Sequence, residues 1–221
     1  MSTIAQNIET IAAKMPQDVR LVAVSKFHPV ERLREAYDAG QRLFGENRVQ
    51  ELVAKAPQLP PDVEWHFIGH LQRNKVRQLL PHVTMIHSVH SVELLRLIDK
   101  EAARIGRTVD VLIELHVAQE MTKSGFAPDE ALRDITPQLL DELSHVRVRG
   151  VMTMATFTSD MEQVAREFAL AQNTFVQMRD QLQFPAFDQL SMGMSEDWPL
   201  AVKHGATMVR IGTDIFGPRE Y

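Results

Sequence analysis

Cysteine is absent from the 221 residues of this chain. Its absence excludes disulfides and thiolate chemistry, and it fits a reducing compartment. The chain also lacks any apolar run near the roughly 20 residues that a membrane-spanning helix needs. Residues 1–15 are polar and helical in pattern, unlike the apolar core of a signal peptide. We therefore expect a soluble, cytoplasmic protein that does not enter a membrane.

Clustered basic charge is missing as well. The formal net charge is −5 and the basic residues are scattered, so the sequence predicts no nucleic-acid partner. His87 and His90 stand three apart, but no carboxylate at a fixed spacing completes a metal-binding motif, and we predict no metal site. No linker rich in proline, glycine or serine interrupts the ordinary globular composition. The sequence therefore predicts one domain over residues 1–221.

What the chain does contain is an alternation of short apolar or β-branched runs with amphipathic stretches. Such alternation is typical of strands and helices that build a parallel sheet. The eight predicted strands are Leu21–Ser25, Arg42–Gly45, Glu64–Ile68, Met85–Ser88, Val109–Val117, Val146–Met152, Phe187–Ser191 and Thr207–Ile211.

Eight strand–helix units in roughly 200 residues predict an α/β fold of the closed (β/α)8 type, a TIM barrel. A doubly wound open sheet is the alternative. Between the strands, Ser91 is suited to cap a helix whose apolar face runs from Leu94 to Ile105. A second helix begins near Asp160, and its apolar stripe from Met161 to Leu182 is expected to pack in the core.

Lys26 follows the first predicted strand. In a (β/α)8 barrel the working groups lie at the carboxyl ends of the strands, where a lysine amine can form a Schiff base with a carbonyl. Burial and a nearby cation such as Arg210 would lower the pKa of that amine. Taken alone, a lysine at this position is more often a solvated strand end than a Schiff-base lysine, so the residues at the other strand ends decide between the two interpretations.

The loops after the seventh and eighth strands favour a phosphate site. Barrels often bind phosphate between these two loops, using small residues, hydroxyls and free backbone N–H groups. Ser191, Gly193 and Ser195 supply these features after strand seven, and Gly212 with Thr213 supplies them after strand eight. Each loop alone is also consistent with a simple turn. An amine opposite a phosphate site suits a phosphorylated aldehyde, of which pyridoxal phosphate is the obvious one.

An ordered set of motifs spans nearly the whole chain, from about residue 4 to residue 219. On these motifs the chain resembles the pyridoxal phosphate homeostasis proteins, the YggS/PROSC family. The motifs are Ala23–Lys26, Phe44–Asn47, Trp65–Gly69, Leu71–Gln72 with Asn74–Lys75, Lys123–Gly125, Gly150–Thr153, Ser191–Ser195 and Val209–Thr213.

The resemblance implies a barrel of pyridoxal-phosphate fold type III, like the N-terminal half of alanine racemase, with an extra N-terminal helix and no C-terminal β domain. It implies a Schiff base between pyridoxal 5′-phosphate and Lys26. It also implies that the cofactor is lined by Asn47, Ser191, Gly193, Ser195, Arg210, Gly212 and Thr213. Members of the family are thought to bind and buffer the cofactor and to hand it to apo-enzymes.

Two other functions stay open from the sequence. A racemase-like enzyme needs an acid or base on each face of the cofactor. In alanine racemase the second base depends on a C-terminal domain and a partner subunit, whereas this chain ends eight residues after Thr213, so we expect a monomeric carrier rather than an enzyme. An aldolase acting on a sugar phosphate would explain the amine and the phosphate site equally well.

Two further residues have open roles in the sequence. Lys123 stands in the loop after strand five and is interpreted either as a surface lysine or as a transient second site for the aldehyde. His66 lies inside the third predicted strand, and we expect it to pack there rather than to take part in chemistry.

Overall fold

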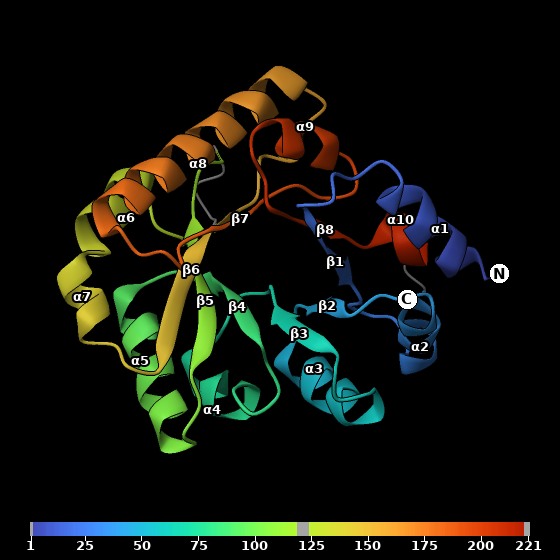
Figure 1. The fold of residues 1–221 in the computed structure, drawn as a ribbon, viewed down its shortest axis with the longest axis horizontal. Coiled ribbons are helices and arrows are strands. Elements are labelled where there is room, and N and C mark those ends of the chain that lie inside the picture. The colour runs from blue at the N-terminus through green and yellow to red at the C-terminus, as the bar shows by residue number, and fades with distance from the viewer. Residues whose placement is uncertain (1, 119–123, 219–221) are drawn as a thin grey trace.

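The chain forms a closed barrel of eight parallel strands surrounded by helices (Figure 1). The computed structural model describes residues 2–118 and 124–218. Each strand pairs with the next in the sequence, and β1 closes the ring by pairing with β8, with Val22 beside Arg210. The predicted (β/α)8 barrel is therefore confirmed, and the open-sheet alternative is wrong.

All eight predicted strands are present, with shifts at their ends. The strands are β1 Arg20–Val24, β2 Leu43–Glu46, β3 Glu64–Phe67, β4 Met85–Val89, β5 Val109–Leu115, β6 Val146–Thr153, β7 Gln189–Ser191 and β8 Met208–Ile211. The largest differences are at β5, which is shorter than predicted at its end, and at β7, which is shorter at its beginning. The N–H of Phe187 bonds to the carbonyl oxygen of Phe184 in a turn, so it does not join the β7 ladder.

Helices and short helical turns connect the strands. The helices are α1 Thr3–Ala12, α2 Val30–Asp38, α3 Val49–Lys55, α4 Val76–Leu79, α5 Val92–Arg104, α6 Pro128–Asp134, α7 Pro137–Asp141, α8 Met161–Leu182, α9 Trp198–Lys203 and α10 Thr213–Phe216. Two 3₁₀ turns, Ala56–Gln58 and Arg73–Lys75, precede β3 and α4. The expected N-terminal helix is α1, and Asn7 ties it to α10 by donating to the carbonyl oxygen of Ile215 at 3.0 Å.

The predicted helix caps are in place. The hydroxyl of Ser91 accepts from the N–H of Leu94 at 3.1 Å, and the carboxylate of Asp160 accepts from two N–H groups at the start of α8. Each bond satisfies a backbone donor that has no partner inside the helix. Helix α8 buries most of the predicted stripe, including Phe168 and Met178.

Two residues of the predicted apolar faces are not in the core. Ile105 and Met161 are each 43% exposed. Ile105 lies one residue beyond the end of α5, where the backbone has left the helical conformation. Met161 is the first residue of α8. The prediction that the stripe from Met161 to Leu182 packs in the core is therefore wrong at Met161.

The inside of the barrel has an apolar part and a polar part. Six side chains form an apolar cluster separate from the main core between barrel and helices: Val22, Leu43, Met85, Leu112, Met152 and Met208. His66, His87, Ser191 and Arg210 are also buried, but they bond to one another instead. The expectation that His66 packs within the third strand is confirmed. Among the described residues, no helix has the length and apolar character needed to cross a membrane.

Candidate functional site

A pocket of about 350 Å³ opens at the carboxyl ends of the strands, and we call it the rim pocket. Its lining combines residues at or just after the ends of β1, β2, β3, β6, β7 and β8 with the start of α8. The lining residues are Val24, Lys26, Asn47, Ile68, Met154, Ala155, Thr156, Phe157, Thr158, Met161, Val164, Met194, Ser195, Glu196, Asp197, Arg210, Gly212 and Thr213. Six of the eight predicted site residues are among them, so the barrel brings the predicted amine and most of the predicted phosphate site together.

Lys26 reaches the rim pocket from the turn after β1. The N–H of Ser25 donates to the carbonyl oxygen of Gly45 at 2.9 Å, so the chain stays tied to β2 up to this point. Ser25 is fully buried, whereas Lys26 is half-buried and lines the pocket. The strand end therefore places the lysine between the barrel interior and solvent, where its amine meets small molecules that enter the pocket.

Arg210 supplies a buried positive charge to the rim pocket. The side chain is 4% exposed and donates to Ser191 Oγ at 2.7 Å and to the carbonyl oxygen of Thr153 at 2.8 Å. Burial lowers its pKa to about 10, while the negative charges of Asp197 and Glu114 act in the opposite direction. The guanidinium therefore stays charged at neutral pH. Because both acceptors are uncharged, its positive charge remains available to an anionic or electron-rich ligand.

Ser191 and Gly193 lie behind the pocket lining. Ser191 is fully buried, accepts from Arg210, and lies 3.2 Å from His87 Nδ1. Gly193 has φ +95°, and a Cβ there would stand 2.6 Å from the Cβ of Ala201 on α9. Its carbonyl oxygen accepts from the N–H of Arg210 at 3.0 Å. These two residues hold Arg210 and the following turn, and their direct contact with a ligand stays a prediction.

Several polar groups at the rim pocket have no protein partner. Asn47 Oδ1 is buried without a hydrogen-bond partner. Within the part of the chain that the structure describes, the backbone N–H groups of Ser195 and Glu196 also have no acceptor. The turn that carries them is fixed because Asp197 accepts from the N–H of Met194 at 2.6 Å. A buried polar group without a partner costs free energy, so the pocket that keeps Asn47 Oδ1 is suited to a polar ligand.

These groups fit pyridoxal phosphate. Lys26 is the amine that would take its aldehyde, and Arg210 is the cation that would face its ring or its phosphate. Ser195, Gly212 and Thr213 supply hydroxyls and backbone N–H groups suited to a phosphate, and all three line the same pocket. Asn47 supplies an amide with an unused acceptor. The donor set thus matches a phosphorylated aldehyde at both of its polar ends.

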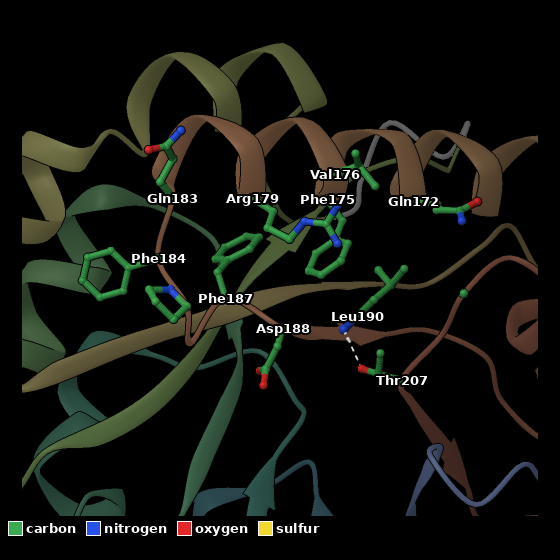
Figure 2. A pocket seen from close by; sticks show the side chains of 12 residues that line it. Gln172, Phe175, Val176, Arg179, Gln183, Phe184, Phe187, Asp188, Leu190 and Thr207 are labelled. Atoms are coloured by element: carbon green, nitrogen blue, oxygen red, sulfur yellow. Dashed lines mark hydrogen bonds between the residues drawn. The ribbon is translucent and has the colours of Figure 1, made fainter.

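A second hollow is larger than the rim pocket but differs in chemistry, and we call it the outer groove. Its volume is about 500 Å³, and Figure 2 shows it between the second half of α8 and the segment that leads into β7. Some of its polar groups already have protein partners: the N–H of Leu190 donates to Thr207 Oγ1 at 2.8 Å (Figure 2), and Asp188 pairs at 2.9 Å with Arg149, which lies outside the lining. The sequence did not predict this hollow.

Two parts of the rim pocket, and a buried carboxyl that interacts electrostatically with Arg210, were missed by sequence reasoning. The loop Met154–Thr158 after β6 and the first turn of α8 line the rim pocket, but neither was predicted to have a functional role. Glu114 on β5 is buried, and burial raises its pKa to about 7. The signal for the loop was available, because residues that follow a barrel strand lie at the rim. The inward direction of Glu114 had no comparable signal.

The loop after β5 is only partly described. Lys123, interpreted from the sequence either as a surface lysine or as a second site for the aldehyde, lies outside the described residues. Its neighbour Ser124 is described and lies 3.2 Å from both carboxyl oxygens of Glu114. Within residues 2–118 and 124–218, no three side chains of the metal-binding types come together.

Comparison with known proteins gives full-length relatives. The chain matches the alanine racemase N-terminal domain family over residues 1–220. It is 38% identical over 239 residues to the pyridoxal phosphate homeostasis protein of Vibrio alginolyticus, covering 100% of both chains. It is 43% identical to the Aquifex aeolicus protein of the same name, covering 91% of this chain and 88% of the relative. The human protein of that name is 36% identical, covering 100% of this chain and 86% of the human one.

Solved structures point to the same family as the sequence relatives. PipY from Synechococcus elongatus without PLP is 40% identical, with a TM-score of 0.92 over 97% of this chain and 100% of PipY. The same protein solved with PLP bound has a TM-score of 0.89. Alanine racemase from Clostridium difficile shares the fold at 18% identity and a TM-score of 0.80, and this chain covers 57% of it. The chain belongs to the alanine racemase N-terminal domain family and, within it, to the pyridoxal phosphate homeostasis proteins.

Proposed function

We propose that this protein binds pyridoxal 5′-phosphate reversibly in the rim pocket through Lys26 and serves in homeostasis of the cofactor. The observation that carries the proposal is the composition of one pocket: a lysine amine, a buried guanidinium with uncharged acceptors, and polar groups without partners. PipY, which is 40% identical, was solved with PLP bound. Full-length relatives are named for homeostasis of the cofactor.

Bound pyridoxal phosphate supplies an aldehyde carbon, which forms a C=N bond with a lysine amine and releases one water without any oxidant. Lys26 presents that amine at the pocket wall. The reverse reaction with water, or exchange with another amine, frees the lysine again. A protein that holds its ligand in this way keeps it out of solution and still releases it.

The other residues orient the ligand. Arg210 is held on two sides by Ser191 and Thr153, so its guanidinium has little freedom to move and keeps one direction toward the pocket. The turn at Ser195 and the residues Gly212 and Thr213 offer hydrogen-bond donors to a phosphate. Charge-assisted hydrogen bonds of this kind are stronger than neutral ones, so this end of the pocket is expected to supply most of the non-covalent affinity.

The composition of the pocket favours a carrier over a racemase. A two-base racemase needs a proton donor and acceptor on each face of the ligand. The described lining contains no tyrosine, no histidine and no lysine besides Lys26. We therefore propose that apo-enzymes are the partners that receive the cofactor. Racemisation of a common amino acid at ordinary enzyme rates, abolished in Lys26→Ala, would reverse this preference.

The proposal is tested by the visible spectrum of the purified protein with added pyridoxal phosphate. We expect an absorption band of the lysine adduct that vanishes in Lys26→Ala and persists in Lys203→Ala, which removes an exposed lysine on α9. A band that survives loss of Lys26 contradicts the assignment of the lysine.

The carrier role needs its own experiment. Holoprotein mixed with an apo-enzyme that uses pyridoxal phosphate is expected to lose its band while the enzyme gains activity. Retention of the whole band with no gain in enzyme activity counts against delivery, even if binding is confirmed. Size-exclusion chromatography of the same samples tests the predicted monomer.

A further inference from the structure

The backbone on both sides of Lys26 is held by side chains from a different part of the chain. Lys55 at the end of α3 donates to the carbonyl oxygen of Ser25 at 3.1 Å. Glu51, one turn earlier on α3, accepts from the N–H of Phe27 at 2.9 Å. The residue before Lys26 and the residue after it are therefore each fixed by a charged side chain of one helix.

These two side chains belong to a closed cluster with Glu46, which we call the charge clamp. Lys55 Nζ lies 2.7 Å from Glu46 Oε1 and 3.0 Å from Glu51 Oε2. With the bond to the Ser25 carbonyl, the three hydrogens of the ammonium have three acceptors. Ser25 Oγ also donates to Glu46 Oε1, at 2.7 Å. The clamp is thus joined to the lysine turn through side-chain and backbone atoms.

The clamp is largely shielded from water. Glu46 is fully buried and Lys55 is 9% exposed. Burial raises the pKa of Glu46, while its bonds to Lys55 and Ser25 act in the opposite direction. A buried ion pair is a doubtful source of net stability, because desolvation of the charges offsets much of their attraction. The presence of one directly behind Lys26 therefore calls for a reason other than stability.

The turn that the clamp holds has an unfavourable backbone conformation. Phe27 has φ +67°, in the left-handed region that residues other than glycine rarely adopt. Arg48 lies over its ring at 4.8 Å. Such a conformation persists only where the surroundings impose it, and it is common at functional sites. The bond from Phe27 N–H to Glu51 holds this conformation, together with the bond from His28 N–H to the carbonyl oxygen of Ser25 at 3.2 Å.

We propose that the charge clamp of Glu46, Glu51 and Lys55 positions Lys26, by fixing the turn from Ser25 to Phe27 so that the lysine amine faces the rim pocket. The three residues act through Lys26 and are positioning residues. The inference rests on the proposed function, since it names what sets the geometry of the lysine that holds the cofactor. The competing explanation is that the clamp only stabilises the barrel.

A double-mutant cycle separates the two explanations. Lys55→Met removes the ammonium at similar length, and equilibrium dialysis gives the affinity for pyridoxal phosphate in the chain with Lys26 and in Lys26→Ala. We expect a loss of at least about tenfold when Lys26 is present and less than about twofold when it is absent. A shift in the pH titration of the visible band is expected as well. Equal losses in both backgrounds overturn the inference.

A second variant keeps the test decisive if Lys55→Met does not fold. Glu51 has a side chain that is 22% exposed, so its replacement is tolerated more easily. Glu51→Gln keeps an oxygen that accepts from Phe27 N–H and is expected to retain most of the affinity, whereas Glu51→Ala is expected to lose it. Equal affinity of the Gln and Ala variants contradicts the clamp.

The control removes a buried charge elsewhere. Asp110→Asn breaks the ion pairs to Arg147 and Arg149, which are not part of the rim pocket, and is expected to leave affinity and spectrum unchanged. Wild-type protein that binds no pyridoxal phosphate overturns the proposed function and the inference together. If wild-type protein forms the adduct, but the clamp variants lose the same affinity with and without Lys26, the inference is overturned and the proposed function stands.

Discussion

The rim pocket and the outer groove lie along the same helix, α8. Among its described residues, the groove lacks the lysine amine and the buried guanidinium that line the rim pocket. The first turn of α8 lines the rim pocket with Met161 and Val164, and its second half lines the outer groove from Gln172 to Gln183. The groove measures about 500 Å³ and the pocket about 350 Å³. Volume alone therefore does not identify the binding site.

What separates the two hollows is the state of their polar groups. In the groove, Asp188 is paired with Arg149, and Thr207 is bonded to Leu190. In the pocket, Asn47 Oδ1 has no partner, and Arg210 bonds only to uncharged acceptors in the described part of the chain. Polar groups left without partners inside a protein cost free energy and indicate a ligand. The following variants test this difference, each with a counterpart in the groove or near it.

Arg210→Met is expected to have the largest effect on binding. Hydrogen bonds to a charged group contribute about 1.5–3 kcal/mol, so affinity for pyridoxal phosphate should fall roughly 10- to 100-fold. Arg179→Met in the outer groove, where Arg179 lies over the ring of Phe175, should leave the affinity unchanged. Equilibrium dialysis measures both, and equal losses would mean that the groove is part of the site.

Glu114→Gln is expected to change stability with pH. Burial raises the pKa of Glu114 from 4.5 to about 7. Between pH 4.5 and pH 7, Glu114 therefore stays protonated in the folded protein but is ionised in the unfolded chain. Its contribution to stability is therefore present below pH 4.5 and is lost as pH rises toward 7. The variant should match wild type near pH 4.5 and be more stable by about 3 kcal/mol at pH 8.

Denaturant unfolding of the cofactor-free protein at the two pH values checks the Glu114 prediction. Asp188→Asn, which removes a half-exposed carboxylate beside Arg149, controls for the loss of one negative charge. A Glu114→Gln variant whose stability difference from wild type is the same at both pH values contradicts the prediction.

Alanine variants of Gly193, behind the rim pocket, and Gly205, in the outer groove, are expected to differ in stability. Both have positive φ, +95° and +83°, so alanine is strained at either position. A Cβ at Gly193 would stand 2.6 Å from the Cβ of Ala201, whereas at Gly205 it would stand 3.1 Å from the flexible Gln172 side chain. Gly193→Ala should therefore be less stable than Gly205→Ala by about 1–2 kcal/mol.

Thermal unfolding checks the glycine comparison, and dialysis adds a second readout. Because Gly193 precedes the turn at Ser195, its alanine variant should also bind pyridoxal phosphate more weakly, and Gly205→Ala should not. The reverse order of stability, or unchanged affinity in Gly193→Ala, contradicts the supporting role given to Gly193.

Asn47→Ala is expected to have the smallest effect. Its amide oxygen has no protein partner to lose, so the folded protein should keep its stability. Loss of one neutral hydrogen bond to the ligand costs about 1 kcal/mol, or roughly fivefold in affinity. Gln183→Ala in the outer groove is the matched amide, and dialysis should show no change for it.

The barrel and the position of Lys26 could be predicted from the sequence. Both follow from the regular alternation of strands and helices along the chain. Eight alternating units specify a closed parallel barrel, and residues after its strands lie at one rim. Lys26, Asn47 and Thr213 follow strand ends and line the rim pocket, and their contact with the cofactor stays a prediction. Ser191 does not, because it is the last residue of β7 and is buried inside the barrel beside Arg210.

The charge clamp could not be predicted from the sequence. Lys55 is the last residue of the short helix α3, and a lysine is ordinarily exposed in a protein. Only the packing of α3 against β2 buries it and brings it to Glu46, nine residues earlier. Sequence spacing specifies contacts within an element, whereas this contact joins a helix to a strand and a turn.

Peptide mapping after borohydride reduction tests the central claim most directly. Reduction of the protein with bound pyridoxal phosphate fixes the cofactor to the amine that holds it, and mass spectrometry of the peptides identifies that amine. The account predicts one cofactor per chain on the peptide that contains Lys26, with Lys123 labelled, if at all, as a second site. A reduced adduct found only on other lysines, or no adduct at all, would contradict it.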